Sequence, residues 1–188
     1  MKNTKPEIGF IGLGIMGGPM AKNLQKAGFS LHICDYDESA LKALADTGAS
    51  IAKSGKAVAE AADIIIIMVP DTPHVEAVLF GDQGVATGLT KGQLVIDMSS
   101  ISPGATIEFA KQINELGCDY LDAPVSGGAP KAITGELSIM VGGPQAAFDR
   151  AGPLFNAMGG TVTLIGERNG DGQVCKVANQ MLVGTMTS

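Results

Sequence analysis

Three spaced glycines join a short apolar run to a helical pattern, and this feature constrains the fold more than any other. The run covers residues 8–13, the helical pattern covers residues 19–27, and the glycines are Gly12, Gly14 and Gly17. In a dinucleotide-binding turn the first glycine allows a tight bend, the second lets backbone approach a pyrophosphate, and the third lets the helix pack closely. The helix N-terminus also directs unpaired N–H groups at the phosphates. The predicted cofactor-binding residues are therefore Gly12, Leu13, Gly14, Ile15, Met16 and Gly17, with an ordinary glycine-rich turn as the alternative in a chain of 26 glycines.

The composition narrows the class of partner. A formal net charge of -6 and a pI near 4.8 argue against nucleic acid, and no basic run opposes this. The longest continuous apolar run, residues 64–69, is too short to cross a bilayer, and residues 1–7 are too polar for a signal peptide. We therefore expect a cytoplasmic protein that binds a small molecule and has no nucleic-acid or membrane partner.

The three cysteines, Cys34, Cys118 and Cys175, are odd in number and widely spaced. This spacing indicates neither a disulfide framework nor a metal site. We expect all three to be reduced residues of the core.

Strand and helix patterns alternate along the chain. Strands are predicted over residues 29–34, 49–52, 64–69, 94–98, 118–121, 137–141 and 162–165, and helices over residues 39–47, 55–62, 109–116 and 145–158, with another that begins at His74. Residues 64–69 are apolar at every position, which is typical of a strand covered on both faces of a parallel sheet. The order predicts an α/β fold with a Rossmann-type, doubly wound and mainly parallel sheet over residues 1–168.

The second predicted strand is followed by Asp35, which lies about 20 residues beyond the glycine turn. A carboxylate at this place can accept hydrogen bonds from the adenosine ribose and repels a 2′-phosphate. Tyr36 and Asp37 follow, and no arginine stands close by to hold such a phosphate. The sequence therefore favours NAD over NADP. The alternative is that Asp35 opens the turn before the next helix.

Two further turns follow predicted strands at their carboxyl ends, the edge at which doubly wound sheets bind ligands. Met68, Val69 and Pro70 end the apolar strand, so their backbone is expected beside the adenosine half of the cofactor. Ser100 belongs to a group of serines after the next strand, and these could bind a nicotinamide carboxamide or a substrate carboxylate. The alternative is that the serines cap the next helix, a role expected of Ser102.

Residues 122–128, D-A-P-V-S-G-G, form a second candidate anion site. The small residues would let backbone N–H groups and the Ser126 hydroxyl converge on a carboxylate. A structural turn is an equal alternative.

A last helix is predicted from about Gln173 onward. Lys176 and Asn179 are three residues apart and so share a face of this apolar helix. Removal from water would lower the pKa of Lys176 toward the working pH, as proton transfer requires, and a surface lysine lying over apolar neighbours is the alternative. Since no stop signal precedes Ser188, we expect these residues to be the front part of a longer protein.

Three stretches together carry a specific likeness. The loop G-F-I-G-L-G-I-M-G-G-P-M-A-K-N-L, the stretch D-A-P-V-S-G-G and the spacing G-x-x-x-K-x-x-N at Gly172, Lys176 and Asn179 resemble the β-hydroxyacid dehydrogenases over essentially the whole chain. Within that family, I-D-M-S-S-I-S-P, D-A-P-V-S-G-G-A-P-K-A and K-V-A-N-Q are similar to the tartronate semialdehyde reductase branch. The resemblance implies an NAD-dependent interconversion of a small β-hydroxyacid and its semialdehyde, most specifically reduction of tartronate semialdehyde to glycerate.

The resemblance also implies roles for single residues. Lys176 would be the catalytic lysine and Asn179 would hold a small carboxylic-acid substrate. The remaining implied contacts are Ser126, Gly127 and Gly128 with the substrate carboxylate, and Ser100 with the nicotinamide. Family members continue into an all-helical domain that closes the cleft and forms the dimer. Residues 169–188 would then be the first part of an interdomain helix, the helical domain would be absent from this chain, and the longer protein would be a homo-oligomer.

Two other functions stay open. One is a dehydrogenase of 3-hydroxyisobutyrate or a related hydroxyacid. The other is a non-catalytic dinucleotide-binding or assembly module, in which the apolar residues Val174, Val177, Met181 and Leu182 of the last helix pair with another copy or another protein.

Overall fold

The computed structural model describes residues 5–186, with side chains as far as residue 182. Two predictions lie partly outside this range. They concern the polar segment at residues 1–7 and the lack of a helix stop signal before Ser188. The strands are β1 (Ile8–Ile11), β2 (Leu31–Cys34), β3 (Ser50–Ile51), β4 (Ile64–Ile67), β5 (Leu94–Asp97), β6 (Asp119–Asp122), β7 (Val125–Ser126), β8 (Leu137–Gly142) and β9 (Gly159–Gly166). The helices are α1 (Gly17–Lys26), α2 (Glu38–Ala45), α3 (Gly55–Ala61), α4 (Thr72–Phe80), η1 (Val85–Thr87), α5 (Pro103–Glu115), α6 (Gly128–Thr134), α7 (Gln145–Met158) and α8 (Asp171–Met186).

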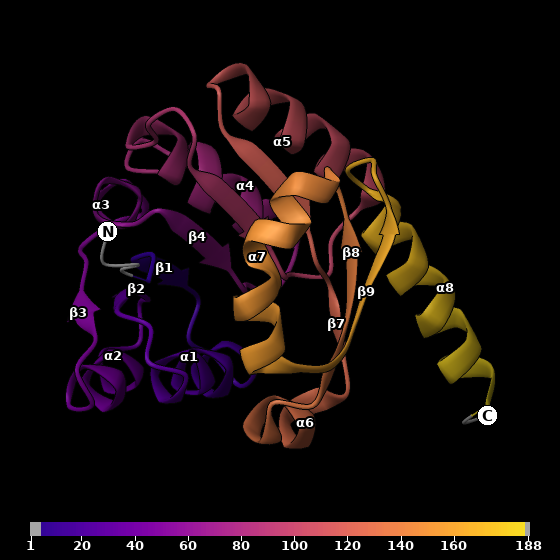
Figure 1. Ribbon diagram of the computed structural model, residues 1–188, viewed down its shortest axis with the longest axis horizontal. Helices are drawn as coiled ribbons and strands as arrows, with labels where there is room; N and C mark the ends of the chain where they lie inside the picture. The colour runs from indigo at the N-terminus through magenta and orange to yellow at the C-terminus, as the bar shows by residue number, and fades with distance from the viewer. Residues whose placement is uncertain (1–4, 187–188) are drawn as a thin grey trace.

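The strands of this region form one sheet in the order β3-β2-β1-β4-β5-β6-β8-β7, with β9 paired to β8. The first six strands pair in parallel in the 3-2-1-4-5-6 order of a doubly wound dinucleotide fold, and the strand order reverses between β1 and β4. The predicted α/β fold class, Rossmann type with a mainly parallel sheet, is therefore confirmed. Figure 1 shows α8 beside β9, at the edge of the sheet remote from β3.

Helices cover both faces of the parallel strands, as the apolar run in β4 predicts. Ile64 and Ile66 pack with residues of α1, α2 and α7, whereas Ile65 and Ile67 pack with residues of α3, α4 and α5. All four isoleucines are at most 1% exposed. Because side chains alternate between the two faces of a strand, only a sheet with two cores can bury such a run.

The last third of the sheet departs from the parallel pattern, since β8 pairs antiparallel with both β6 and β7. The connection from β7 to β8, residues 127–136, is shorter than the roughly dozen residues that a parallel crossover needs. The elements β7, α6 and η1 were not predicted from the sequence, because they are short and lie in segments rich in glycine. The predicted start of α5 at residue 109 is too late, because this helix already starts at Pro103, where the ring fixes φ for the first turn.

The side chain of Ser102 makes no capping hydrogen bond, although this residue stands at the N-cap position of α5. The predicted capping role of its hydroxyl is therefore wrong. The cysteine prediction holds in part. All three thiols are free, but only Cys118 is buried, whereas Cys34 and Cys175 are half-buried.

Within residues 5–186, no helix combines the length and the apolar character needed to cross a membrane.

Candidate functional site

The glycine loop after β1 is held by close backbone contacts at the point where the strand order reverses. Gly12 has φ +94°, and a Cβ there would lie 2.1 Å from the carbonyl oxygen of Met68. A Cβ on Gly17 would lie 1.9 Å from the carbonyl oxygen of Gly12 and 3.2 Å from the Phe10 ring. A side chain at either position is therefore excluded, which keeps β1, α1 and the turn after β4 in contact.

The middle of the same loop is open. Apart from its chain neighbours, no atom in the described part of the chain lies within 4 Å of a Cβ added to Gly14, and the neighbouring Ile15 is 80% exposed. No side chain caps the first turn of α1, and this turn holds no acidic residue, whereas Asp37, Ser54 and Asp71 cap α2, α3 and α4. The free N–H groups and the positive end of the α1 dipole thus face open space above Gly14, which fits a pyrophosphate.

Asp35 lies at the end of β2 and holds the glycine loop through its carboxylate. Oδ2 accepts the Leu13 N–H at 2.5 Å, and Oδ1 accepts the Asp37 N–H at 2.8 Å. The bond to Asp37 shows that Asp35 also opens the turn before the next helix, as the alternative interpretation states. Each carboxylate oxygen can accept two hydrogen bonds and here accepts one, so Asp35 keeps the capacity for the predicted contact with ribose hydroxyls.

A cavity of about 350 Å³ adjoins Asp35 and reaches from the glycine loop to the end of α4. Its lining includes Gly12, Asp35, Tyr36, Lys53, Ser54, Val69 and Ala77. Its size and partly apolar lining suit an adenosine group. Of the three residues predicted beside this half of the cofactor, Val69 lines the cavity, Met68 touches Gly12, and Pro70 is exposed and does not line the cavity.

The turns after β4 and β5 are joined by Ser99, which the sequence analysis did not single out from its neighbours. Its hydroxyl accepts the Val69 N–H at 3.0 Å, and its own N–H donates to Asp97 Oδ1 at 3.0 Å. Ser99 is fully buried, whereas Ser100 is exposed at the sheet edge. Ser99 is thus structural, and the predicted contact of Ser100 with nicotinamide stays a prediction.

Two buried carboxyl groups lie beneath this edge. Burial raises the pKa of Asp97 to about 7, against the lowering effect of hydrogen bonds from Ser99 and from the Tyr120 hydroxyl. Burial likewise raises the pKa of Asp122 to about 6, although N–H groups of Gly170 and Gln173 donate to it and lower it. Neither residue was predicted as functional, because sequence alone does not show that an acidic side chain is buried.

The stretch D-A-P-V-S-G-G runs through β7 into the start of α6 and meets α8. Gly127 and Gly128 have φ of +131° and +67°, and a Cβ on Gly127 would lie 2.6 Å from Cδ of Lys131. Asn179 Nδ2 donates to Ser126 Oγ at 3.3 Å. The structure thus brings the predicted carboxylate-binding turn and the lysine helix together.

Lys176 lies one turn before Asn179 on α8 and is half-buried. Burial lowers the pKa of its ammonium group. Among residues 5–182, no carboxylate is within ion-pair distance of Lys176 to oppose this shift. A lysine in such surroundings gives up its proton more readily than one in water.

Comparison with known proteins decides the family. A family model described as the NAD binding domain of 6-phosphogluconate dehydrogenase matches residues 7–166. The chain is 56% identical over 177 residues to 2-hydroxy-3-oxopropionate reductase of Escherichia coli K12, covering 94% of this chain and 60% of that protein. The chain belongs to the β-hydroxyacid dehydrogenase family.

Other members of the β-hydroxyacid dehydrogenase family agree in sequence and structure. An NAD-dependent L-serine dehydrogenase of Pseudomonas aeruginosa is 42% identical, covering 96% of this chain and 60% of that protein. A crystal structure of 3-hydroxyisobutyrate dehydrogenase from Salmonella typhimurium superposes with a TM-score of 0.90 at 36% identity, covering 96% of this chain and 63% of that one. The chain thus spans about three fifths of the length of these relatives, and it carries their nicotinamide-dinucleotide-binding domain.

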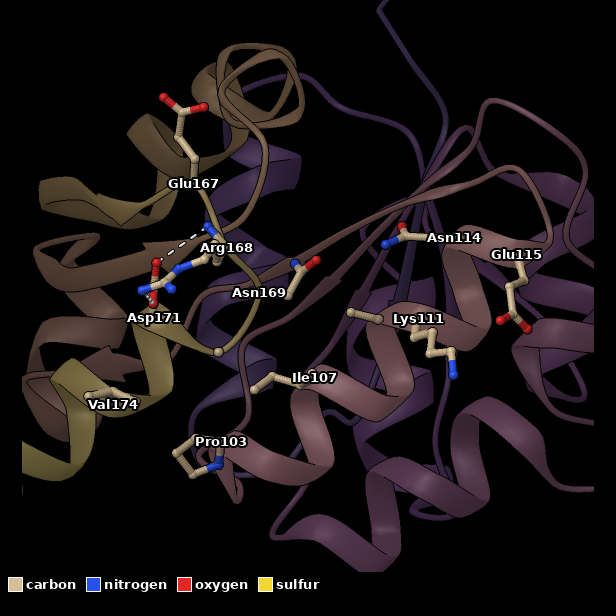
Figure 2. Close-up of a pocket in the computed structure, with 12 residues that line it drawn as sticks. Pro103, Ile107, Lys111, Asn114, Glu115, Glu167, Arg168, Asn169, Asp171 and Val174 are labelled. Atoms are coloured by element: carbon tan, nitrogen blue, oxygen red, sulfur yellow. Dashed lines mark hydrogen bonds and ion pairs between the residues drawn. The ribbon is translucent and has the colours of Figure 1, made fainter.

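A second, larger groove on this β-hydroxyacid dehydrogenase domain lies away from the glycine loop. It measures about 800 Å³ and runs between α5 and the turn from β9 into α8. Figure 2 shows Pro103 and Ile107 along α5, with Arg168 and Asp171 on the opposite side. None of the predicted site residues lines this groove, so volume alone would have misplaced the site.

Two glycine variants distinguish a position needed for ligand binding from a position needed for folding. Gly14→Ala adds a methyl group where the protein has no atom within 4 Å, so we expect an unchanged melting temperature and a fall of about ten-fold or more in NADH affinity. Gly17→Ala meets the Gly12 carbonyl, so we expect it to lower the melting temperature by several degrees, since overpacking costs about 1–3 kcal/mol. Calorimetric titration and thermal unfolding measure the two effects, and equal NADH affinity in Gly14→Ala and the parent chain would contradict the assignment of this loop.

Proposed function

We propose that this chain forms the coenzyme-binding part and supplies the proton-donating lysine of an NADH-dependent reductase of small semialdehyde acids. The observation that carries the proposal is the bond from Asn179 to Ser126, which holds α8 against the end of β7. Lys176 shares a helical face with Asn179. The helix that carries both begins at the carboxyl end of β5, where Gln173 bonds to Ser99.

The residues suit reduction of a carbonyl group. When bound, a reduced nicotinamide supplies a hydride to the carbonyl carbon. The Lys176 ammonium group would donate a proton to the carbonyl oxygen, and the neutral amine would take it back in the oxidative direction. Burial favours this exchange because it lowers the pKa of Lys176 toward neutral pH.

The substrate carboxylate would be held by the Ser126 hydroxyl and by backbone N–H groups of Gly127 and Gly128. The Asn179 amide donates one hydrogen to Ser126 and keeps a second hydrogen and its carbonyl oxygen for the substrate. In this arrangement the substrate is an acid whose carbonyl carbon lies two positions from its carboxylate carbon, with the carboxylate at this turn and the carbonyl oxygen toward Lys176.

Among such acids we favour tartronate semialdehyde, which would be reduced to glycerate. The support is the 56% identity to the E. coli 2-hydroxy-3-oxopropionate reductase, compared with 42% to the human mitochondrial 3-hydroxyisobutyrate dehydrogenase. Oxidation of 3-hydroxyisobutyrate or a related hydroxyacid is the second candidate.

A non-catalytic assembly module remains the contrasting possibility. The α8 residues Val174, Val177, Met181 and Leu182 are between 43% and 69% exposed, which would suit pairing with a second copy. Substrate turnover by the protein speaks for the reductase, and its absence speaks for the module.

Variants of Lys176 test the reaction. We expect Lys176→Ala to lower kcat for tartronate semialdehyde by about 10²–10⁴-fold, the usual contribution of a positioned acid, with NADH affinity unchanged. Lys176→Arg keeps the positive charge but does not release its proton, so kcat should fall while KM changes little. Steady-state NADH oxidation by the longest natural chain that contains these 188 residues measures both, with Lys111→Ala on α5 as the control lysine.

The pH profile adds a second readout. Reduction needs the protonated lysine, so kcat/KM should be level at low pH and fall as pH rises through the lowered pKa of Lys176. Loss of this limb in Lys176→Ala supports the role of the lysine. A variant that keeps its rate and its pH limb would refute that role.

We further propose that Asp35 makes the protein prefer NAD over NADP, because its charge faces the adenosine cavity. Asp35→Asn removes the charge but keeps a carbonyl oxygen for the Leu13 N–H, so the loop is disturbed less than by alanine. We expect the ratio of NADPH to NADH affinity to rise by about ten-fold, and fluorescence titration measures it.

Asp37→Asn removes a charge two residues away that caps α2, and it serves as the control. An unchanged ratio in Asp35→Asn, or an equal rise in the control, would contradict this assignment.

A further inference from the structure

The first turn of α8 lacks a cap of its own and receives one from β6. The residue before the helix is Gly170, with φ +96° and no side chain. The Asp122 carboxylate takes the place of the missing cap, because Oδ1 accepts the Gly170 N–H at 2.7 Å and Oδ2 accepts the Gln173 N–H at 3.0 Å. Asp122 is fully buried, and its charge faces the positive end of the α8 dipole.

Gln173 fixes the same turn to the end of β5. Its Nε2 donates to the Ser99 carbonyl oxygen at 2.8 Å, and its Oε1 accepts the Ile101 N–H at 3.2 Å. The side chain is 1% exposed, so both bonds are shielded from water. Asp122 and Gln173, which we call the anchor pair, thus attach α8 to the ends of two neighbouring strands.

Two glycines let the helix come this close. A Cβ on Gly142 of β8 would lie 2.6 Å from the Gly172 nitrogen and 2.8 Å from Asp122 Oδ1. A Cβ on Gly172 would lie 2.5 Å from the Met140 carbonyl oxygen. The approach of α8 to the sheet therefore depends on the absence of side chains beside the Asp122 carboxylate.

The direction of α8 determines where its later residues lie. Asn179 stands six residues beyond Gln173, about 9 Å along the axis, so a tilt of about 10° would move it by about 1.5 Å. A shift of this size exceeds the tolerance of a hydrogen bond such as that from Asn179 to Ser126, and misplacement by about 1 Å can lower a rate about 100-fold.

We propose that Asp122 and Gln173 are positioning residues, which fix the direction of α8 and therefore the place of Lys176. Neither residue touches the substrate in this proposal, which rests on the proposed function only in assigning the reaction to Lys176. The anchor pair acts at the backbone of the helix, and the lysine lies one turn further along.

The test compares Asp122→Asn and Gln173→Ala with a matched control at the other end of β5. Gln93 is also a buried glutamine, 8% exposed, with both ends of its amide bonded, to Thr90, Ala59 and Ala62. Gln93→Ala therefore removes an equivalent cross-link far from α8. Gln173→Met keeps the volume of the side chain and removes both of its bonds, which separates polar attachment from packing.

The first readout is hydrogen exchange of the α8 amides in the 188-residue chain, followed by mass spectrometry. We expect exchange in the first two turns to be about ten-fold faster or more in Asp122→Asn, Gln173→Ala and Gln173→Met, and unchanged in Gln93→Ala. The second readout is turnover in the longest natural chain that contains these residues. There kcat should fall by about ten-fold or more in the anchor variants, with NADH affinity unchanged within about two-fold.

Unchanged α8 exchange in the anchor variants, or an equal change in Gln93→Ala, would overturn the proposal. A faster-exchanging helix with an undiminished kcat would overturn it as well, because the position of Lys176 would then not depend on the anchor pair. If the parent protein reduces no semialdehyde but the exchange contrast is present, the anchoring of α8 stands and the proposed reaction fails.

Discussion

The close backbone contact between Gly17 and Gly12 is the constraint on which the rest of the site depends. It brings the start of α1 onto the end of β1, and Gly12 in turn touches the Met68 carbonyl in the turn after β4. These contacts leave a free helix N-terminus above Gly14, at the place where the order of the sheet reverses. The site is thus an open space beside backbone N–H groups, kept clear by the lack of side chains at Gly12, Gly14 and Gly17, and it suits a negatively charged group.

From this loop a continuous series of hydrogen bonds runs along the carboxyl edge of the sheet. Ser99 joins the turns after β4 and β5, Gln173 joins the latter turn to α8, and Asp122 joins β6 to the same helix. The buried carboxyl groups of Asp97 and Asp122 accept backbone and hydroxyl hydrogens. Neither forms an ion pair with a cationic side chain among residues 5–182. Polar groups that are buried and hydrogen-bonded to one another give this edge one arrangement, which a site for two ligands needs.

The sequence predicted a structural feature correctly where a local pattern of residues determines it. The glycine spacing predicted the turn, the four isoleucines of β4 predicted a sheet covered on both faces, and the three-residue interval from Lys176 to Asn179 predicted a shared helical face. It did not predict contacts between segments that are far apart in the chain. Nothing local distinguishes Ser99 from Ser100, or shows that Asp122 caps a helix that begins 49 residues later, at Asp171. The short elements β7 and α6 were missed for a similar reason, since β8 and α1 stabilise them rather than their own periodicity.

The central prediction is that a dinucleotide binds with its diphosphate above Gly14 and its adenosine in the cavity beside Asp35. The most direct measurement is calorimetric titration of NADH and NADPH into the chain, followed by a crystal structure of the chain soaked with the tighter ligand. We expect one NADH per chain, weaker binding of NADPH, and diphosphate density over the first turn of α1. Absence of binding by either nucleotide, or density in the groove between α5 and α8 instead, would contradict it.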